Sequence, residues 1–245
     1  MSDNQDPSNA PAGARQTVEG GNGQMFDAIA ERYDLLNRIL SGGMDQGWRK
    51  KALKNLALKP GDHVLDLATG TGDLAIMIAQ RTPEVTVMGV DPSANMIAVG
   101  DEKIAKSNLQ TRVEMQIGDG QDLPFEDDTF DGAVVAFGIR NFPDRLAGLR
   151  EMHRVTKPGR KVVVLELSEP KKGVLAPFAR AYIHHIVPTI GSTLSGKQEY
   201  RYLQKSIEAF PTAEEFVGLM TEVGLKDAHA IPLSFGAVHL YVGTV

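Results

Sequence analysis

The 245-residue sequence contains no cysteine. Disulfide bonds, thiolate metal sites and cysteine nucleophiles are therefore excluded, and the composition fits a reducing compartment. Aromatic residues make up only 6%, and long apolar runs are also missing, since a run such as Val162–Leu165 has the length of a strand. A transmembrane helix needs about 20 apolar residues, so we expect no membrane-spanning segment.

Positive charge is scarce as well. Lys and Arg number 26 against 31 Asp and Glu, which gives a net charge of -5. A nucleic-acid binder normally carries a basic stripe, so we expect no nucleic-acid partner. The first residues, MSDNQDPSNAPAGARQ, lack the apolar stretch of a secretory signal. These features predict a soluble, cytoplasmic protein.

The chain reads as one domain with a tail and an insertion. Residues 1–24 carry little that could be buried and predict a disordered tail, and the domain extends over 25–245. Apolar residues recur at helical spacing over 25–58, which predicts two N-terminal cap helices. Residues 170–210 predict a mostly helical insertion over the substrate cleft.

Between these parts, short apolar strands alternate with helices. Strands are expected near 63–68, 85–90, 112–117, 131–137 and 160–167, with helices near 73–81, 93–107 and 143–155. A helix near 212–223 and two closing strands, at 225–231 and 236–243, complete the pattern. Such alternation is typical of parallel β–α–β units, so we predict a doubly wound α/β fold.

The stretch VLDLATGTGDLA, residues 64–75, predicts a buried strand, a glycine turn and a helix. Gly70-Thr71-Gly72 together with Ala75 satisfies the pattern G-x-G-x-x-A, which is typical of nucleotide-binding turns. NAD, FAD and S-adenosylmethionine all bind at such turns, and a tight turn without a ligand would have the same pattern.

Three acids favour S-adenosylmethionine among these ligands. Asp66, inside the strand, is expected to point into the cleft and meet the methionyl ammonium directly or through water. Asp91 would accept hydrogen bonds from ribose hydroxyls, which suits NAD equally, and Asp119 would accept from the adenine amino group. Each acid alone could instead serve as a cap or a turn residue. Three acids together suit a cationic sulfonium better than a pyrophosphate, although an NAD-dependent oxidoreductase stays an alternative.

Further motifs carry a family resemblance: FDAIAERYDLLN (26–37), LPF (123–125), FGIRN (137–141), RVTKPG (154–159) and YRYLQKSIEAFP (200–211). With these motifs the chain resembles the UbiE-like ubiquinone/menaquinone biosynthesis C-methyltransferases, a family of class I S-adenosylmethionine-dependent enzymes. The resemblance implies a mostly parallel seven-stranded sheet with an antiparallel last strand. It also implies methylation of a ring carbon on a prenylated benzoquinol or naphthoquinol. The chain departs from the usual family pattern at Leu36, Asp45, Ala136, Thr156 and Arg160.

Three residues are candidates for catalysis. Arg140 and Asn141 follow the fourth strand, at the edge where an α/β sheet opens onto its crevice. We expect Arg140 to orient a water that takes the phenolic proton, and Asn141 to hold the ring oxygen. Tyr33, on the N-terminal helix, would close the site. Arg140 could instead pair only with Asp144 or Glu151, and Tyr33 could be a packing residue.

The predicted cofactor-binding residues are Asp66, Gly70, Thr71, Gly72, Asp91, Met96, Asp119 and Gly120. No metal ligands are predicted. His184 and His185 are neighbours on a predicted helix, where adjacent side chains point about 100° apart and cannot easily share one ion.

The implied partner is a prenyl quinol derived from a membrane. An apolar stripe in the insertion, which includes Phe178 and Tyr182, could line a groove for the prenyl chain, although a core stripe would have the same pattern. Transient contact with the inner face of the membrane is therefore predicted, and a homodimer is left open. The rival functions are a methyltransferase acting on another small phenolic or lipid acceptor and a non-catalytic protein that binds the cofactor.

Overall fold

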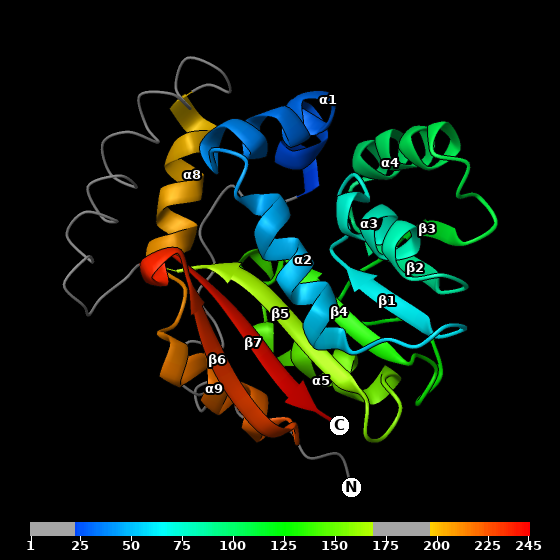
Figure 1. Ribbon diagram of the computed structural model, residues 1–245. Helices are drawn as coiled ribbons and strands as arrows, with labels where there is room; N and C mark the ends of the chain where they lie inside the picture. Colours follow the sequence, from blue (N-terminus) through cyan, green and yellow to red (C-terminus); the bar gives the residue numbers. More distant parts are fainter. Residues whose placement is uncertain (1–22, 169–196) are drawn as a thin grey trace, which may run out of the picture.

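A computed structural model describes residues 23–168 and 197–245 of the chain (Figure 1). The predicted tail therefore lies outside the described residues except for its last two positions, which already belong to the first helix. Most of the predicted insertion, including His184, His185, Phe178 and Tyr182, also lies outside them.

The helices are α1 (Gly23–Leu40), α2 (Asp45–Leu56), α3 (Asp73–Arg81), α4 (Ala94–Lys106), α5 (Arg145–Val155), α8 (Lys197–Glu208) and α9 (Ala213–Glu222). Two short 3-10 helices are η2 (Ile139–Asn141) and η4 (Ser234–Gly236). The strands are β1 (His63–Leu67), β2 (Thr86–Asp91), β3 (Val113–Ile117), β4 (Gly132–Ala136), β5 (Lys161–Leu167), β6 (Lys226–Leu233) and β7 (Val238–Thr244).

All seven strands form one sheet in the order β3-β2-β1-β4-β5-β7-β6. Neighbours among β1 to β5 pair in parallel, whereas β7 pairs antiparallel with both β5 and β6. The predicted doubly wound α/β fold with an antiparallel last strand is confirmed. The carboxyl ends of β1, β2 and β4 consequently lie side by side at one edge of the sheet, where the predicted site residues are placed.

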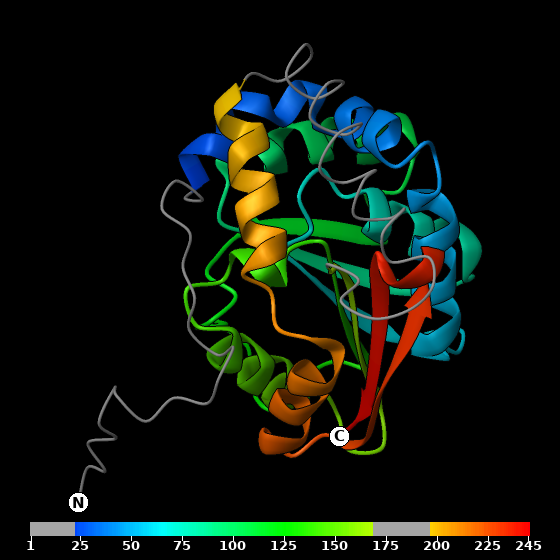
Figure 2. The same cartoon turned by 90° about the vertical axis from the view of Figure 1, so that its left-hand side faces the viewer.

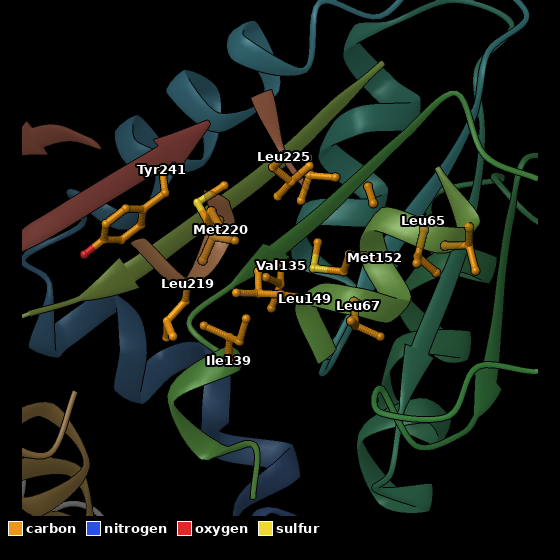
Figure 3. Packing of buried hydrophobic residues seen from close by; sticks show 14 of the residues in the cluster. Leu65, Leu67, Val135, Ile139, Leu149, Met152, Leu219, Met220, Leu225 and Tyr241 are labelled. Atoms are coloured by element: carbon orange, nitrogen blue, oxygen red, sulfur yellow. The ribbon is translucent and has the colours of Figure 1, made fainter. Parts of the chain in front are cut away.

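Helices cover both faces of the sheet, and each face has its own apolar core. On one face, Leu65 and Val135 of the sheet pack with Leu149 of α5 and Leu219 of α9 (Figure 3). On the other face, strand residues such as Val134 pack with α2 and α3, for example with Leu56 and Ile78. The central strands are thus buried on both sides, which explains why their sequences are nearly continuous apolar runs.

Helix α1 is placed differently from the others. It lies beyond the carboxyl ends of the strands, and its main packing partner is α4 (Figures 1 and 2). Helix α8 crosses the same end of the molecule and contacts η2. The site at this end is therefore bounded by two helices from distant parts of the chain.

Strand β6 forms one outer edge of the sheet and pairs only with β7. Its Pro232 lies opposite His239 and is exposed. Proline has no N–H to donate, and within sheets it is confined to edge strands, strand ends or bulges. The charged residues Lys226 and Asp227 at the start of this strand are exposed too.

Candidate functional site

A cavity of about 290 Å³ lies at the carboxyl ends of β1, β2 and β4. Helix α1 contributes Phe26 and Tyr33 to its wall, and η2 contributes Asn141. The other lining residues are Ala68, Gly70, Val90, Asp91, Pro92, Met96, Asp119, Gly120, Gln121, Phe137, Gly138, Phe142 and Pro143. Of the predicted site residues, the cavity thus brings together Tyr33, Asn141, Gly70, Asp91, Met96, Asp119 and Gly120.

The glycine turn needs glycine for its backbone conformation. Gly70 has φ +58° and Gly72 has φ +74°, both in the left-handed region that L side chains rarely adopt. Gly70 lines the cavity, and its N–H donates to Asp91 Oδ2 over 2.9 Å. Gly72 instead caps the start of α3, and a Cβ there would lie 3.0 Å from Met115 Sδ. The turn therefore links the ends of β1 and β2.

Asp91 is held in place by backbone donors. Besides Gly70, the N–H of Ser93 donates to its Oδ1 over 2.9 Å. Burial raises the pKa of Asp91, and the two backbone hydrogen bonds act against this rise. An ionised carboxylate offers about four lone-pair positions, so two donors leave capacity for a ligand hydroxyl.

Asp119 also lines the cavity and is exposed. Its Oδ1 accepts hydrogen bonds from the backbone N–H of Gln121 (2.9 Å) and from Gln121 Nε2 (3.0 Å). Gln121, which the sequence analysis did not single out, thereby orients this carboxylate and lines the cavity itself.

Asp66 is buried below the turn and does not border the cavity. Thr69 Oγ1 donates to its Oδ2 over 2.7 Å. Desolvation raises the pKa of Asp66 to about 7, against the opposing hydrogen bond from Thr69. Because Asp66 does not line the cavity, the structure does not support the predicted direct contact between its carboxylate and a cofactor ammonium. A role for Asp66 in cofactor binding stays a prediction.

Thr71 also does not line the cavity. Its Oγ1 donates to Asp34 Oδ1 over 2.6 Å, so the hydroxyl joins the turn to α1. The predicted cofactor-binding role of Thr71 stays a prediction as well.

Arg140 is buried beside Glu166, a residue of β5. Its Nη1 donates to Glu166 Oε1 over 2.8 Å and also to the carbonyl of Phe137. Burial alone would lower the pKa of Arg140, but the charge and hydrogen bond of Glu166 outweigh it and raise the pKa. Arg140 therefore stays a cation, paired with neither Asp144 nor Glu151.

Two tyrosines complete this part of the site. Tyr202 of α8 donates its hydroxyl to Asn141 Oδ1 over 2.8 Å. The hydroxyls of Tyr33 and Tyr202 are both near enough to Arg140 to affect its pKa. Tyr202 lies in one of the motifs that carry the family resemblance, but the sequence analysis predicted no role for it and did not single out Glu166. Glu166 is the one acid in the apolar strand KVVVLEL. A buried acid needs a cation as its partner, so this pattern could have indicated that Glu166 pairs with a buried arginine or lysine.

None of the positions that depart from the usual family pattern lines the cavity, although Ala136 directly precedes the lining residue Phe137. Asp45 is buried near Ser41 and Arg49, Thr156 is buried, and Arg160 pairs with Asp62 and Asp131. Within residues 23–168 and 197–245, no three His, Asp or Glu side chains gather as metal ligands would, and no helix is long and apolar enough to cross a membrane.

The fold and the cavity define the class of protein. A putative S-adenosylmethionine-dependent methyltransferase of Methanococcus maripaludis shares the fold, with a TM-score of 0.67, 16% identity and coverage of 94% of this chain and 95% of that one. An S-adenosylmethionine-dependent methyltransferase of Aquifex aeolicus aligns with a TM-score of 0.57, at 20% identity over 80% of this chain and 89% of that one. The fold is that of the class I methyltransferases.

Residues 15–245 match the ubiE/COQ5 methyltransferase family, and the chain belongs to that family. It is 43% identical to the ubiquinone/menaquinone biosynthesis C-methyltransferase UbiE of Geotalea daltonii, over 90% of this chain and 94% of the relative. It is 42% identical to the demethylmenaquinone methyltransferase of Porphyromonas gingivalis, over 89% of this chain and 90% of the relative. Membership of this family identifies the chain as an S-adenosylmethionine-dependent methyltransferase.

The cavity fits that cofactor. Its volume is close to the lower end of the range of about 300–1,000 Å³ that is typical of small-molecule sites. It combines an apolar wall with Asp91 and Asp119, two acceptors that come from neighbouring strand ends. Gly70 supplies the left-handed backbone conformation of the turn beside the Tyr33 ring, which a Cβ at this position would meet at an ordinary contact distance of 3.8 Å.

Proposed function

We propose that this protein methylates a ring carbon of a prenylated benzoquinol or naphthoquinol. The named activities of its relatives, ubiquinone/menaquinone biosynthesis C-methylation and demethylmenaquinone methylation, support this acceptor class. The observation that carries the proposal is Arg140, a buried cation that Glu166 holds next to the cavity residue Asn141, which in turn accepts from the hydroxyl of Tyr202. Such a constellation suits an acceptor that becomes an anion.

Each of these residues has a task in the reaction. When bound, S-adenosylmethionine would supply an electrophilic methyl group on a good leaving group, so that its bond from sulfur to methyl breaks as the new bond to the ring carbon forms. The chain must align the acceptor and help the phenolic proton to leave, and the ring hydrogen that the methyl group replaces is then released to water. Arg140 remains protonated, so it acts as a hydrogen-bond donor and not as a base. It orients the water that takes the phenolic proton and stabilises the phenolate that forms.

The other polar groups position the acceptor. Asn141 accepts from Tyr202 through its Oδ1, which leaves its amide N–H groups to donate to a ring oxygen. Tyr33 closes the cavity from α1 and adds a hydroxyl near the phenolate. Alignment of this kind is worth up to about 7–11 kcal/mol of a reaction barrier.

In the cofactor site, Asp91 accepts from the ribose hydroxyls and Asp119 accepts from the adenine amino group. Gly70, Gly120 and Met96 form the wall against which the cofactor packs. Asp66 accepts from Thr69 of the turn and attracts the methionyl ammonium through intervening groups, while Thr71 and Gly72 support the turn from α1 and α3. A prenylated acceptor also implies transient contact with a membrane surface, because its hydrocarbon chain partitions into lipid.

The test uses S-adenosylmethionine labelled on its methyl group, with demethylmenaquinol and a demethylated benzoquinol analogue as acceptors. Label on a ring carbon supports the proposal, and the ratio of the two rates assigns the ring type. Label on a soluble phenol but on neither quinol would favour the rival acceptor class. Binding of the cofactor without any transfer would refute the proposed acceptor and leave the cofactor site intact.

A further inference from the structure

Two carboxylates on α1 attach this helix to the body of the protein. Asp27 and Asp34 are seven residues apart, so they lie two turns apart on the same face of the helix. Asp27 Oδ1 accepts from Ser93 Oγ over 2.5 Å and from the N–H of Asn95 over 3.2 Å, at the start of α4. Asp34 accepts from Lys103, near the other end of α4.

Lys103 is the centre of the second attachment. Its Nζ donates to Asp34 Oδ2 over 2.6 Å, to Thr71 Oγ1 over 3.0 Å and to Asp73. Thr71 Oγ1 in turn donates to Asp34 Oδ1 over 2.6 Å. This cluster joins α1, the glycine turn, α3 and α4. The side chain of Lys103 is only 25% exposed, so salt screens these contacts less than those of a surface pair.

Each carboxylate follows an aromatic residue of the cavity wall. Phe26 precedes Asp27 and Tyr33 precedes Asp34, and the two rings contact each other with centroids 6.3 Å apart. The attachments of α1 therefore hold this aromatic pair in the wall of the cavity.

We propose that Asp34 and Lys103 form a latch that holds α1 closed over the cofactor cavity and sets the rate at which cofactor and product leave. Both are positioning residues, because they act through Phe26 and Tyr33 and do not line the cavity themselves. Thr71 belongs to the latch through its hydroxyl. The inference concerns the retention of cofactor alone, so it does not depend on the identity of the methyl acceptor.

The test compares the wild type with Asp34→Asn, which keeps the shape of the side chain and removes its charge. Without any acceptor present, the dissociation rates of S-adenosylmethionine and S-adenosylhomocysteine are measured by stopped flow. Both rates are expected to rise about fivefold to tenfold, as the loss of a partly buried ion pair implies. Amide hydrogen exchange without cofactor is expected to accelerate in α1 and to stay unchanged in the sheet.

Matched variants separate the latch from a general loss of charge. Glu102→Gln removes a carboxylate from an ion pair with Lys106 on the same α4, where both side chains are more than 70% exposed, and is expected to change neither rate. Lys103→Met should behave like Asp34→Asn, and Lys103→Arg should restore slow dissociation. The double variant Asp34→Asn/Lys103→Met should be no faster than Lys103→Met alone, because both substitutions break the same contact.

Several outcomes would overturn the latch. Unchanged dissociation rates in both Asp34→Asn and Lys103→Met would do so, whether or not α1 exchanges faster. Faster exchange throughout the sheet, together with a lower melting temperature, would show that these residues only stabilise the fold. A failure of the quinol methylation test would leave these results untouched, because no acceptor is used here.

Discussion

Glu166 and Arg140 form an ion pair inside the protein, with Nη1 of the arginine 2.8 Å from Oε1 of the glutamate. The carboxylate also accepts from the backbone N–H of Leu167 over 2.8 Å and from that of Arg140 over 3.2 Å. The side chain of Glu166 is fully buried and that of Arg140 is largely buried, so each is the main counter-charge of the other. The pair therefore fixes both the charge and the orientation of the guanidinium beside the cavity.

Removing one member of this pair is expected to be costly. Glu166→Gln leaves Arg140 without its counter-charge and should lower the free energy of unfolding by about 3–5 kcal/mol, measured by urea denaturation. Arg140→Met/Glu166→Gln removes both charges and should be more stable than Glu166→Gln alone. Equal stability of the two variants would show that the unpaired charge of Arg140 is not what destabilises Glu166→Gln.

The same pair should be visible in catalysis. In Glu166→Gln the rate constant kcat is expected to fall about 10²-fold to 10³-fold, the size that the loss of an electrostatic stabiliser has in other enzymes. Affinity for S-adenosylmethionine, measured by calorimetry, should change little because neither residue lines the cavity. A normal kcat in Glu166→Gln would show that turnover does not need the ion pair with Arg140.

Tyr202 and Tyr241 provide a contrast between two buried hydroxyls. Tyr202→Phe removes the donor to Asn141, which should raise KM for the quinol or lower kcat by about tenfold, the effect of one hydrogen bond. The hydroxyl of Tyr241 has no hydrogen-bond partner among the described residues, so Tyr241→Phe should leave stability and turnover unchanged or slightly improved. Steady-state kinetics and thermal melting of both variants test the contrast.

Asp66 should make stability depend on pH. Its pKa is raised to about 7 in the folded protein from 3.8 in a model peptide, so the folded state binds the extra proton between these values. Stability of the cofactor-free protein should therefore fall as pH rises from about 4 to 7, by up to about 4 kcal/mol. In Asp66→Asn this component of the pH dependence, followed by urea denaturation at several pH values, should vanish.

Glycine positions differ in what they tolerate. Gly72→Ala places a Cβ at positive φ and 3.0 Å from Met115 Sδ, so a loss of about 1–3 kcal/mol is expected in urea denaturation. Gly47, in α2, has open space around it, so Gly47→Ala should stabilise the helix by up to about 1 kcal/mol. If both substitutions lowered the free energy of unfolding, the backbone conformation and the space around each glycine would not explain which glycines can be replaced.

The sequence predicted the strands and central helices to within about two residues, because apolar periodicity and glycine turns are local signals. The order of the elements was enough to infer parallel crossovers. The partner of Arg140 was not predictable in the same way. Asp144 and Glu151 are near in sequence, but the first caps α5 by accepting from Ala147 and the second pairs with Arg154.

Glu166 instead lies 26 residues from Arg140, and the two meet only because β5 pairs with β4. For a similar reason, a pattern of acids at strand ends identifies the edge of the sheet that carries the site but not the bonds that each acid makes. Asp91 and Asp119 line the cavity, whereas Asp66 does not line it and accepts a hydrogen bond from the hydroxyl of Thr69.

The proline at the outer edge of the sheet also bears on self-association. Pro232 cannot donate a backbone hydrogen bond, and the exposed Lys226 and Asp227 flank the start of β6, so this edge is poorly suited to pairing with a strand of a second copy. The described part of the fold thus protects this edge of the sheet against fibre-like growth.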